Sequence, residues 1–202
     1  MTGPKPLTAE KLQTYLQRSI NNPPPGDVEI WNAFRKGSES AFVYIYETNF
    51  DRLYAYGLRI VGDACLVEDA IQEVFIDLRN HKNRLSETDS IKFYLFKCLK
   101  RKLHREASKW YLKRNDFDAH LDFGFTLSHE QHLINKQIDE ETLARLNNAI
   151  QNLSTRKKEI IYYFFYEGMD YMQIQEIMGL ENLKTTRNLM YKALGFLRKT
   201  LG

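Results

Sequence analysis

Side chains that can bind nucleic acid are concentrated at the end of the chain. From Lys184 to the last residue there is no Asp or Glu. Arg and Asn can each make two hydrogen bonds with a base edge in the major groove, whereas Lys and Thr suit phosphate contacts. The candidate DNA-binding residues of this segment are Lys184, Thr185, Arg187, Asn188, Tyr191 and Lys192. This composition favours DNA reading, and the alternative is a basic, solvated face on an ordinary helical hairpin.

Two short helices are predicted to position these side chains. In "DYMQIQEIMGLENLKTTRNLMYKALGFLRK", Gln173 follows Asp170 by three residues, an arrangement typical of a helix-starting capping box. Gly179 is a suitable left-handed stop for the first helix. Apolar residues at helical spacing then predict one buried face on each helix: Tyr171, Ile174, Ile177 and Met178 on the first, and Thr186, Met190, Ala193, Leu194 and Leu197 on the second. The pattern predicts a helix-turn-helix with the basic residues on its outer face.

A second candidate site is the acidic stretch "VEDAIQEVF", residues 67–75. An apolar stripe runs through it and is predicted to be buried: Val67, Ala70, Ile71, Val74 and Leu78. Between Ile60 and Leu78 there are five acids and no Lys or Arg. The side chains opposite the stripe are Glu68, Asp69, Gln72 and Glu73. Because phosphate repels them, they face either solvent or a basic protein surface, and the residues alone leave both interpretations open.

The next predicted helix has the opposite charge. Between Lys92 and Arg114 there are nine Lys or Arg residues and a single acid, Glu106. Aromatic residues are interleaved with them: Phe93, Tyr94, Phe96, Trp110 and Tyr111. Stacking on an aromatic ring contributes roughly 1–3 kcal/mol per base, so this helix could hold an opened DNA strand. For Phe93, Phe96 and Trp110 individually, a place in the core is the preferred interpretation.

Composition limits the other possibilities. Of the 202 residues, 43% are hydrophobic and 27% are charged, which is typical of a helical globular protein, and the net charge of +3 implies no partner by itself. The chain has neither an uncharged apolar stretch of about 20 residues nor the pattern of a signal peptide. Cys65 and Cys98 are predicted to be buried free thiols of a cytoplasmic protein. We expect no enzyme, metal or cofactor, because His120, His129 and His132 lack a standard ligand spacing.

The predicted fold class is all-α, with two small helical domains joined by a flexible linker. Seven acids and one Lys lie between Asn115 and Glu141, where helical periodicity is weak. A short amphipathic stretch, 7–20, ends at "NNPPPGD", which neither a helix nor a strand can cross. The expected organisation is therefore an N-terminal extension over 1–26, a helical bundle over 27–113, an acidic linker over 114–140 and the helix-turn-helix domain over 141–202.

These motifs, in this order, resemble a known family. "VEDAIQEVF" followed by "YLFKCLKRKLHR" is similar to region 2 of the sigma-70 family, and "RNLMYKALGFLR" behind a helix-turn-helix is similar to region 4. From about Glu29 to Lys199 the chain resembles an extracytoplasmic-function (ECF) sigma factor, of the kind found in Bacteroidetes. The resemblance implies a dissociable subunit of bacterial RNA polymerase that directs promoter recognition and transcription initiation. The implied partners are core polymerase, promoter DNA and an anti-sigma factor, often membrane-anchored in this family, without membrane insertion of the chain itself.

The resemblance also implies roles for particular residues. The acidic motif would bind the coiled coil of the largest polymerase subunit through Asp69, Gln72, Glu73 and Phe75, with Glu68 and Asp77 as neighbours. The basic helix would recognise and melt the minus-ten element through Lys97, Lys100, Arg101, His104 and Arg105. The last helix would read the minus-thirty-five element through the six residues named first.

Three features depart from the family pattern. Arg79 stands where a Trp often follows the acidic motif, and Arg101 and Arg105 stand where Asn and Asp are usual. The turn "GLENLK" is one residue longer than usual, which leaves the register of Lys184 and Thr185 open.

The alternative function is a stand-alone helix-turn-helix regulator with an N-terminal dimerisation or sensing domain, which would bind DNA tightly without polymerase.

The length of the linker predicts how the two domains cooperate. About 25 residues average roughly 25–30 Å as a free coil and reach roughly 85 Å when extended. Two contacts separated by two duplex turns are roughly 70 Å apart. We therefore predict that polymerase holds the linker extended, with the linker's acids against a basic channel, and that the chain alone binds promoter DNA weakly.

Overall fold

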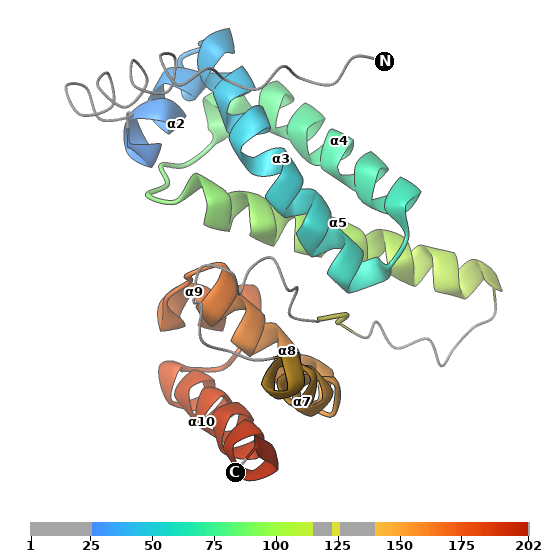
Figure 1. The fold of residues 1–202 in the computed structure, drawn as a ribbon. Coiled ribbons are helices and arrows are strands. Elements are labelled where there is room, and N and C mark those ends of the chain that lie inside the picture. Colours follow the sequence, from blue (N-terminus) through green and yellow to red (C-terminus); the bar gives the residue numbers. More distant parts are fainter. Residues whose placement is uncertain (1–25, 115–122, 126–139, 202) are drawn as a thin grey trace, which may run out of the picture.

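Every regular element of secondary structure is a helix in the residues that the computed structural model describes, which are 26–114, 123–125 and 140–201 (Figure 1). The all-α prediction is therefore confirmed over these residues. The predicted N-terminal extension, its 7–20 stretch, most of the acidic linker and the three histidines His120, His129 and His132 lie outside the described residues.

The first unit consists of α2 (Asp27–Arg35), α3 (Glu39–Val61), α4 (Ala64–Asn80) and α5 (Ile91–Arg114), with a short 3₁₀ helix, η1 (Lys82–Arg84), before α5. Helices α3, α4 and α5 pack against one another (Figure 1). The predicted stripe of α4 is buried in this core. At Gly57 the helices α3 and α4 approach so closely that a Cβ atom would lie 2.6 Å from Val67 Cγ1. A glycine is therefore required there.

Local signals determine where these helices begin and end. The Ser38 and Asp63 side chains accept hydrogen bonds from backbone amides in the first turns of α3 and α4, at 3.3 Å and 3.0 Å. Gly62 ends α3 in the left-handed conformation with φ 67°, which a glycine adopts without steric cost. In addition, the Asp27 carboxylate accepts a hydrogen bond of 2.8 Å from Ile91 N, which joins α2 to the start of α5.

The second unit consists of α7 (Glu140–Gln151), α8 (Thr155–Ile161), the π-helical turn η3 (Tyr162–Tyr166), α9 (Tyr171–Ile177) and α10 (Leu183–Leu201). The predicted capping box is present, because the Asp170 side chain accepts from Gln173 N while the Gln173 side chain accepts from Asp170 N. Gly179 has φ 59° in the turn before α10. Of the stripe predicted on α10, four residues are buried and Leu194 is 36% exposed.

The two units lie against each other, with α8 and α9 beside α5 (Figure 1). The Tyr56 hydroxyl of α3 lies 2.6 Å from the Tyr163 hydroxyl of η3, and both tyrosines are fully buried. The junction between the units is therefore part of the hydrophobic core.

Both cysteines are free, as predicted, but Cys65 is exposed rather than buried because it lies in the first turn of α4, off the buried stripe; Cys98 is half-buried. None of the described helices is long and apolar enough to cross a membrane.

Candidate protein and nucleic-acid interfaces

The acidic face of α4 is open to solvent. The buried stripe points into the bundle, so the side chains between its members project outward. The exposed residues of this face are Glu68, Asp69, Gln72, Glu73, Ile76 and Asp77. Glu73 forms an ion pair with Lys102 of the neighbouring α5. The remaining carboxylates give this surface its negative charge.

Phe75 is buried, although the family resemblance implies that it contacts polymerase. Its side chain is 4% exposed and packs against the rings of Tyr46, at 4.9 Å, and Phe42, at 6.1 Å. In this conformation Phe75 supports α4 from behind and does not reach the outer surface. Its neighbour Ile76, which the sequence motif had not indicated, is 56% exposed and provides an apolar group among the acids.

Arg79, which departs from the family pattern, is held at the end of α4. Its guanidinium lies 2.9 Å from the Glu39 carboxylate and 5.4 Å from the centre of the Phe42 ring. Because Phe42 also contacts Phe75, Arg79 joins the end of α4 to the start of α3. This packing explains how an arginine is accommodated at the position where a tryptophan is common in the family.

The basic helix α5 is divided along its length. The Lys97 and Lys100 side chains form ion pairs with Glu176 of α9 and Glu159 of α8. One turn further on, Arg101, His104 and Arg105 are exposed. Partial burial between the units, together with the charge of Lys100, lowers the pKa of His104. Three of the five predicted minus-ten contacts are thus accessible, and two are engaged by the second unit.

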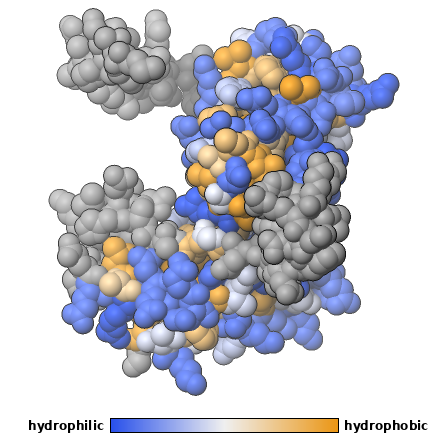
Figure 2. Space-filling view, turned by 90° about the vertical axis from the view of Figure 1, so that its right-hand side faces the viewer, coloured by the Kyte–Doolittle hydropathy of each residue, from blue (hydrophilic) through white to orange (hydrophobic). Residues whose placement is uncertain are grey.

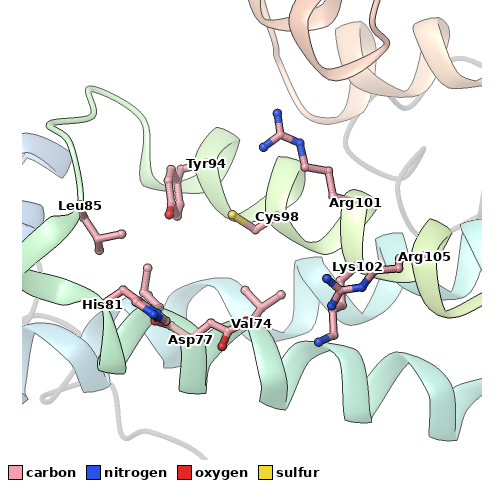
Figure 3. A pocket seen from close by; sticks show the side chains of 10 residues that line it. Val74, Asp77, His81, Leu85, Tyr94, Cys98, Arg101, Lys102 and Arg105 are labelled. Atoms are coloured by element: carbon pink, nitrogen blue, oxygen red, sulfur yellow. The ribbon is translucent and has the colours of Figure 1, made fainter.

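Helices α4 and α5 enclose a hollow of about 310 Å³ (Figure 3). Val74 and Asp77 line it from α4 and His81 from the residue after that helix, while Tyr94 and Cys98 line it from α5. The cationic residues at its rim are Arg101, Lys102 and Arg105. Burial raises the pKa of the Cys98 thiol and is the main cause that raises the pKa of Tyr94 to about 12.

Both groups at the floor of the hollow are therefore neutral at physiological pH. A neutral ring beside a cationic rim suits an unstacked base and its phosphate. Arg101 and Arg105, which belong to the lining of the hollow, are also exposed residues of α5.

On α10 the structure shows where the helix begins and which of the predicted residues are exposed. Leu183 is the first helical residue, and the Asn182 side chain accepts a 2.8 Å hydrogen bond from Thr185 N. Asn182 thus acts as the N-terminal cap of α10. The exposed members of the predicted set are Lys184, Arg187, Asn188, Tyr191 and Lys192, whereas Thr185 is half-buried. Lys184, Arg187, Asn188 and Tyr191 follow the spacing of a single helix face.

Within 26–114, 123–125 and 140–201 there is no cluster of His, Cys, Asp and Glu that could hold a metal ion. Figure 2 shows mostly hydrophilic surface on the side that it presents, with hydrophobic side chains in patches over both units. The charged faces of α4, α5 and α10 are therefore the strongest candidate sites.

Comparison with known proteins places these faces in context. Residues 45–115, from α3 to the end of α5, match the family model of sigma-70 region 2. No curated protein matches the sequence significantly.

Two solved structures share the fold. One is the sigma factor RpoE from Bartonella quintana in complex with the anti-sigma factor NepR, with 18% identity, a TM-score of 0.57, and coverage of 79% of this chain and 96% of that one. The other is CnrH in complex with the cytosolic domain of CnrY, with 17% identity, a TM-score of 0.55, and coverage of 87% and 96%. At these identities the likeness concerns the fold, and it extends across both units.

Proposed function

We propose that this chain, whose residues 45–115 belong to the sigma-70 region 2 family, is an RNA polymerase sigma factor of the ECF type. It binds core polymerase, recognises two promoter elements and directs initiation of transcription. The proposal includes no catalytic residue and no cofactor, because promoter recognition needs binding surfaces only. It also divides the chain into a region 2 domain over 27–113 and a region 4 domain over 141–202, joined by the linker 114–140.

The observation that carries the proposal is the separation of charge within the matched residues. Helix α4 presents Asp69 and its acidic neighbours outward, while α5 presents Arg101 and Arg105. A polyanion such as DNA is attracted to the second surface and repelled by the first. Two partners of opposite charge are therefore expected, and a subunit that joins polymerase to DNA requires both.

On α4 the proposed polymerase contact consists of Glu68, Asp69, Gln72, Glu73 and Asp77. Ile76 extends this contact, because an exposed apolar side chain among charges is suited to the desolvated centre of a protein interface. Phe75 contributes by holding the helix against Phe42 and Tyr46. The partner surface is then basic at its rim and apolar at its centre.

The proposed DNA contacts lie on two helices. On α5 they are Lys97, Lys100, Arg101, His104 and Arg105, next to the hollow that contains Tyr94. On α10 they are Lys184, Thr185, Arg187, Asn188, Tyr191 and Lys192. Arg187 and Asn188 are the best candidates for base edges because both can make two hydrogen bonds there.

Two further parts of the proposal follow from the same role. The chain works in the cytoplasm, where polymerase is. It is also regulated by an anti-sigma factor, an idea supported by the RpoE structure, which is a complex with the anti-sigma factor NepR.

Run-off transcription with bacterial core polymerase and a promoter library tests the proposal. Asp69→Arg should reduce transcription by roughly tenfold or more, which corresponds to about 1.4 kcal/mol of lost polymerase affinity. Glu141→Arg makes the same charge change at an exposed site of α7 and should leave transcription unchanged. A wild-type chain that neither co-elutes with core polymerase nor initiates at any promoter would refute the proposal.

A gel-shift assay with and without core polymerase separates this function from that of a stand-alone regulator. The sigma factor should need polymerase for tight, specific binding to a promoter fragment. Tight and specific binding by the chain alone would favour the regulator.

A further inference from the structure

The second unit covers part of the basic helix α5. The Lys100 ammonium lies 3.0 Å from the Glu159 carboxylate, and the two side chains are only 14% and 12% exposed. Lys97 is paired with Glu176 of α9. Nearer the start of α5, the Lys92 ammonium donates to the Glu167 backbone carbonyl. Acids of the C-terminal unit thus engage three successive lysines of α5.

Three residues from the predicted linker lie within this junction. Phe123 and Phe125 are 2% and 1% exposed, although they come from an acidic segment with little helical periodicity. The Phe123 ring lies 5.3 Å from that of Tyr162 and 6.3 Å from that of Tyr56. The Phe125 ring lies 4.9 Å from that of Tyr166.

Hydrogen bonds to the backbone of Gly124 and Phe125 attach this segment to both units. Gly124 N donates to the carbonyl of Arg59, in the last turns of α3, at 2.8 Å. The Gln151 side chain at the end of α7 donates to the carbonyl of Phe125 at 2.9 Å. The Arg59 guanidinium in turn lies 5.0 Å from the centre of the Tyr162 ring. The tripeptide therefore links α3 of the first unit to α7 and η3 of the second.

This closed arrangement is incompatible with simultaneous promoter contacts. Lys100 is nearly buried against Glu159 and cannot reach phosphate while the pair is intact. Helix α9, which packs on α10, also contacts α5, whereas two promoter elements separated by two duplex turns are roughly 70 Å apart. The units must separate before both can bind DNA.

We propose that residues 123–125 are an intramolecular clasp that holds the chain closed, with α8 and α9 covering the Lys97–Lys100 part of α5. Core polymerase releases the clasp when it binds the chain and extends the linker. The proposal rests on the proposed function for the identity of α5 as a DNA-binding helix and of polymerase as the releasing partner. The closure itself is a property of the chain alone.

Distances between spin labels on the full-length chain test the clasp. One label is attached to Cys65, which is exposed on α4, and the other to a cysteine introduced by Lys199→Cys on α10. Cys98→Ser removes the thiol that would otherwise also be labelled. The labelled chain with wild-type residues 123–125 should give one narrow distribution of distances between the two labels. Phe123→Ala with Phe125→Ala should shift it to a broad distribution at longer distances. The same variant should bind non-specific duplex at low salt at least fivefold more tightly, because α5 is uncovered.

Two further variants make the result decisive. Phe165→Ala removes a phenyl ring that is 56% exposed in the same unit, and it should leave both readouts unchanged. Phe123→Ala alone truncates the ring beside Tyr56 and serves as the deciding variant if the double substitution lowers the helical circular dichroism signal. A clasp variant that keeps its helical content and the narrow wild-type distance distribution would overturn the proposal. Failure of the wild-type chain to initiate with core polymerase would count against the proposed function instead.

Discussion

Helices α5 and α10 have similar composition but different surroundings. Both present Lys and Arg on one face and bury an apolar stripe on the other. The five exposed members of the α10 set face solvent, and the Arg187 guanidinium lies 5.8 Å from the Tyr171 ring centre in the same unit. On α5, by contrast, Lys97 and Lys100 are paired with acids of another part of the chain.

A basic helix is available to DNA only if its own chain leaves it uncovered. The acids that cover α5, Glu159 and Glu176, belong to the same unit as α10. The unit that carries the minus-thirty-five face therefore also shields part of the minus-ten face. We expect the closed chain to present α10 fully and α5 only through Arg101, His104 and Arg105.

The largest effect should come from breaking the most buried ion pair of the junction. Lys100→Met leaves the Glu159 carboxylate, which is 12% exposed, without its described partner. Loss of one member of a buried pair typically costs about 3–5 kcal/mol, and we expect a loss near the lower end because the pair retains some solvent contact. The free energy of unfolding from chemical denaturation measures it.

The matching change on α10 is Lys192→Met, which removes an exposed charge and should alter the free energy of unfolding by less than about 0.5 kcal/mol. Adding Glu159→Leu to Lys100→Met should restore most of the lost stability, because no unpaired charge then remains. Equal effects of the two Lys→Met changes would show that α5 and α10 do not differ in the way described.

The second prediction concerns DNA affinity of the chain without polymerase. Arg187→Ala on α10 should weaken binding to a minus-thirty-five fragment by about 1–3 kcal/mol, because a bidentate base contact is lost. Lys97→Ala on α5 should leave this affinity unchanged, since Lys97 is held by Glu176. Fluorescence anisotropy with both variants gives the comparison, and a matching loss for Lys97→Ala would contradict the covered state of α5.

Local features of the fold could be predicted from the sequence, and long-range ones could not. The stop at Gly62 and the Asp170–Gln173 capping box involve neighbouring residues, so their patterns are visible in the chain itself. The partners Lys100 and Glu159 are 59 positions apart, and Tyr56 and Tyr163 are 107 apart. No short pattern indicates that such residues meet.

Within the candidate sites the same distinction holds. The buried position of Phe75 was available from the sequence, because Ile71, Val74 and Phe75 follow the helical spacing of the stripe. The family motif had instead suggested a surface role. The cap that Asn182 provides for α10 depends on the conformation of a turn, and it became evident only in the structure.

The smallest predicted effect is a pH dependence that α5 should show and the face of α10 should not. His104 lies at the junction, where partial burial and then the charge of Lys100 lower its pKa, while Glu159 acts in the opposite direction. The unfolded chain therefore binds a proton at higher pH than the folded chain does. Between the ordinary histidine pKa of about 6.5 and the lower folded value, the free energy of unfolding must rise with pH. The closed chain should accordingly be slightly more stable at pH 7.5 than at pH 5.5.

His104→Gln should remove this part of the slope while keeping a polar side chain at the position. Chemical denaturation of both proteins at the two pH values isolates the contribution of His104, because every other titrating group is common to both. The DNA-reading face of α10 contains no histidine, so binding of the minus-thirty-five fragment should have the same pH dependence in the two proteins. An unchanged stability slope in His104→Gln would mean that charging this residue does not oppose closure, and the junction would then depend on the lysine pairs and the aromatic core alone.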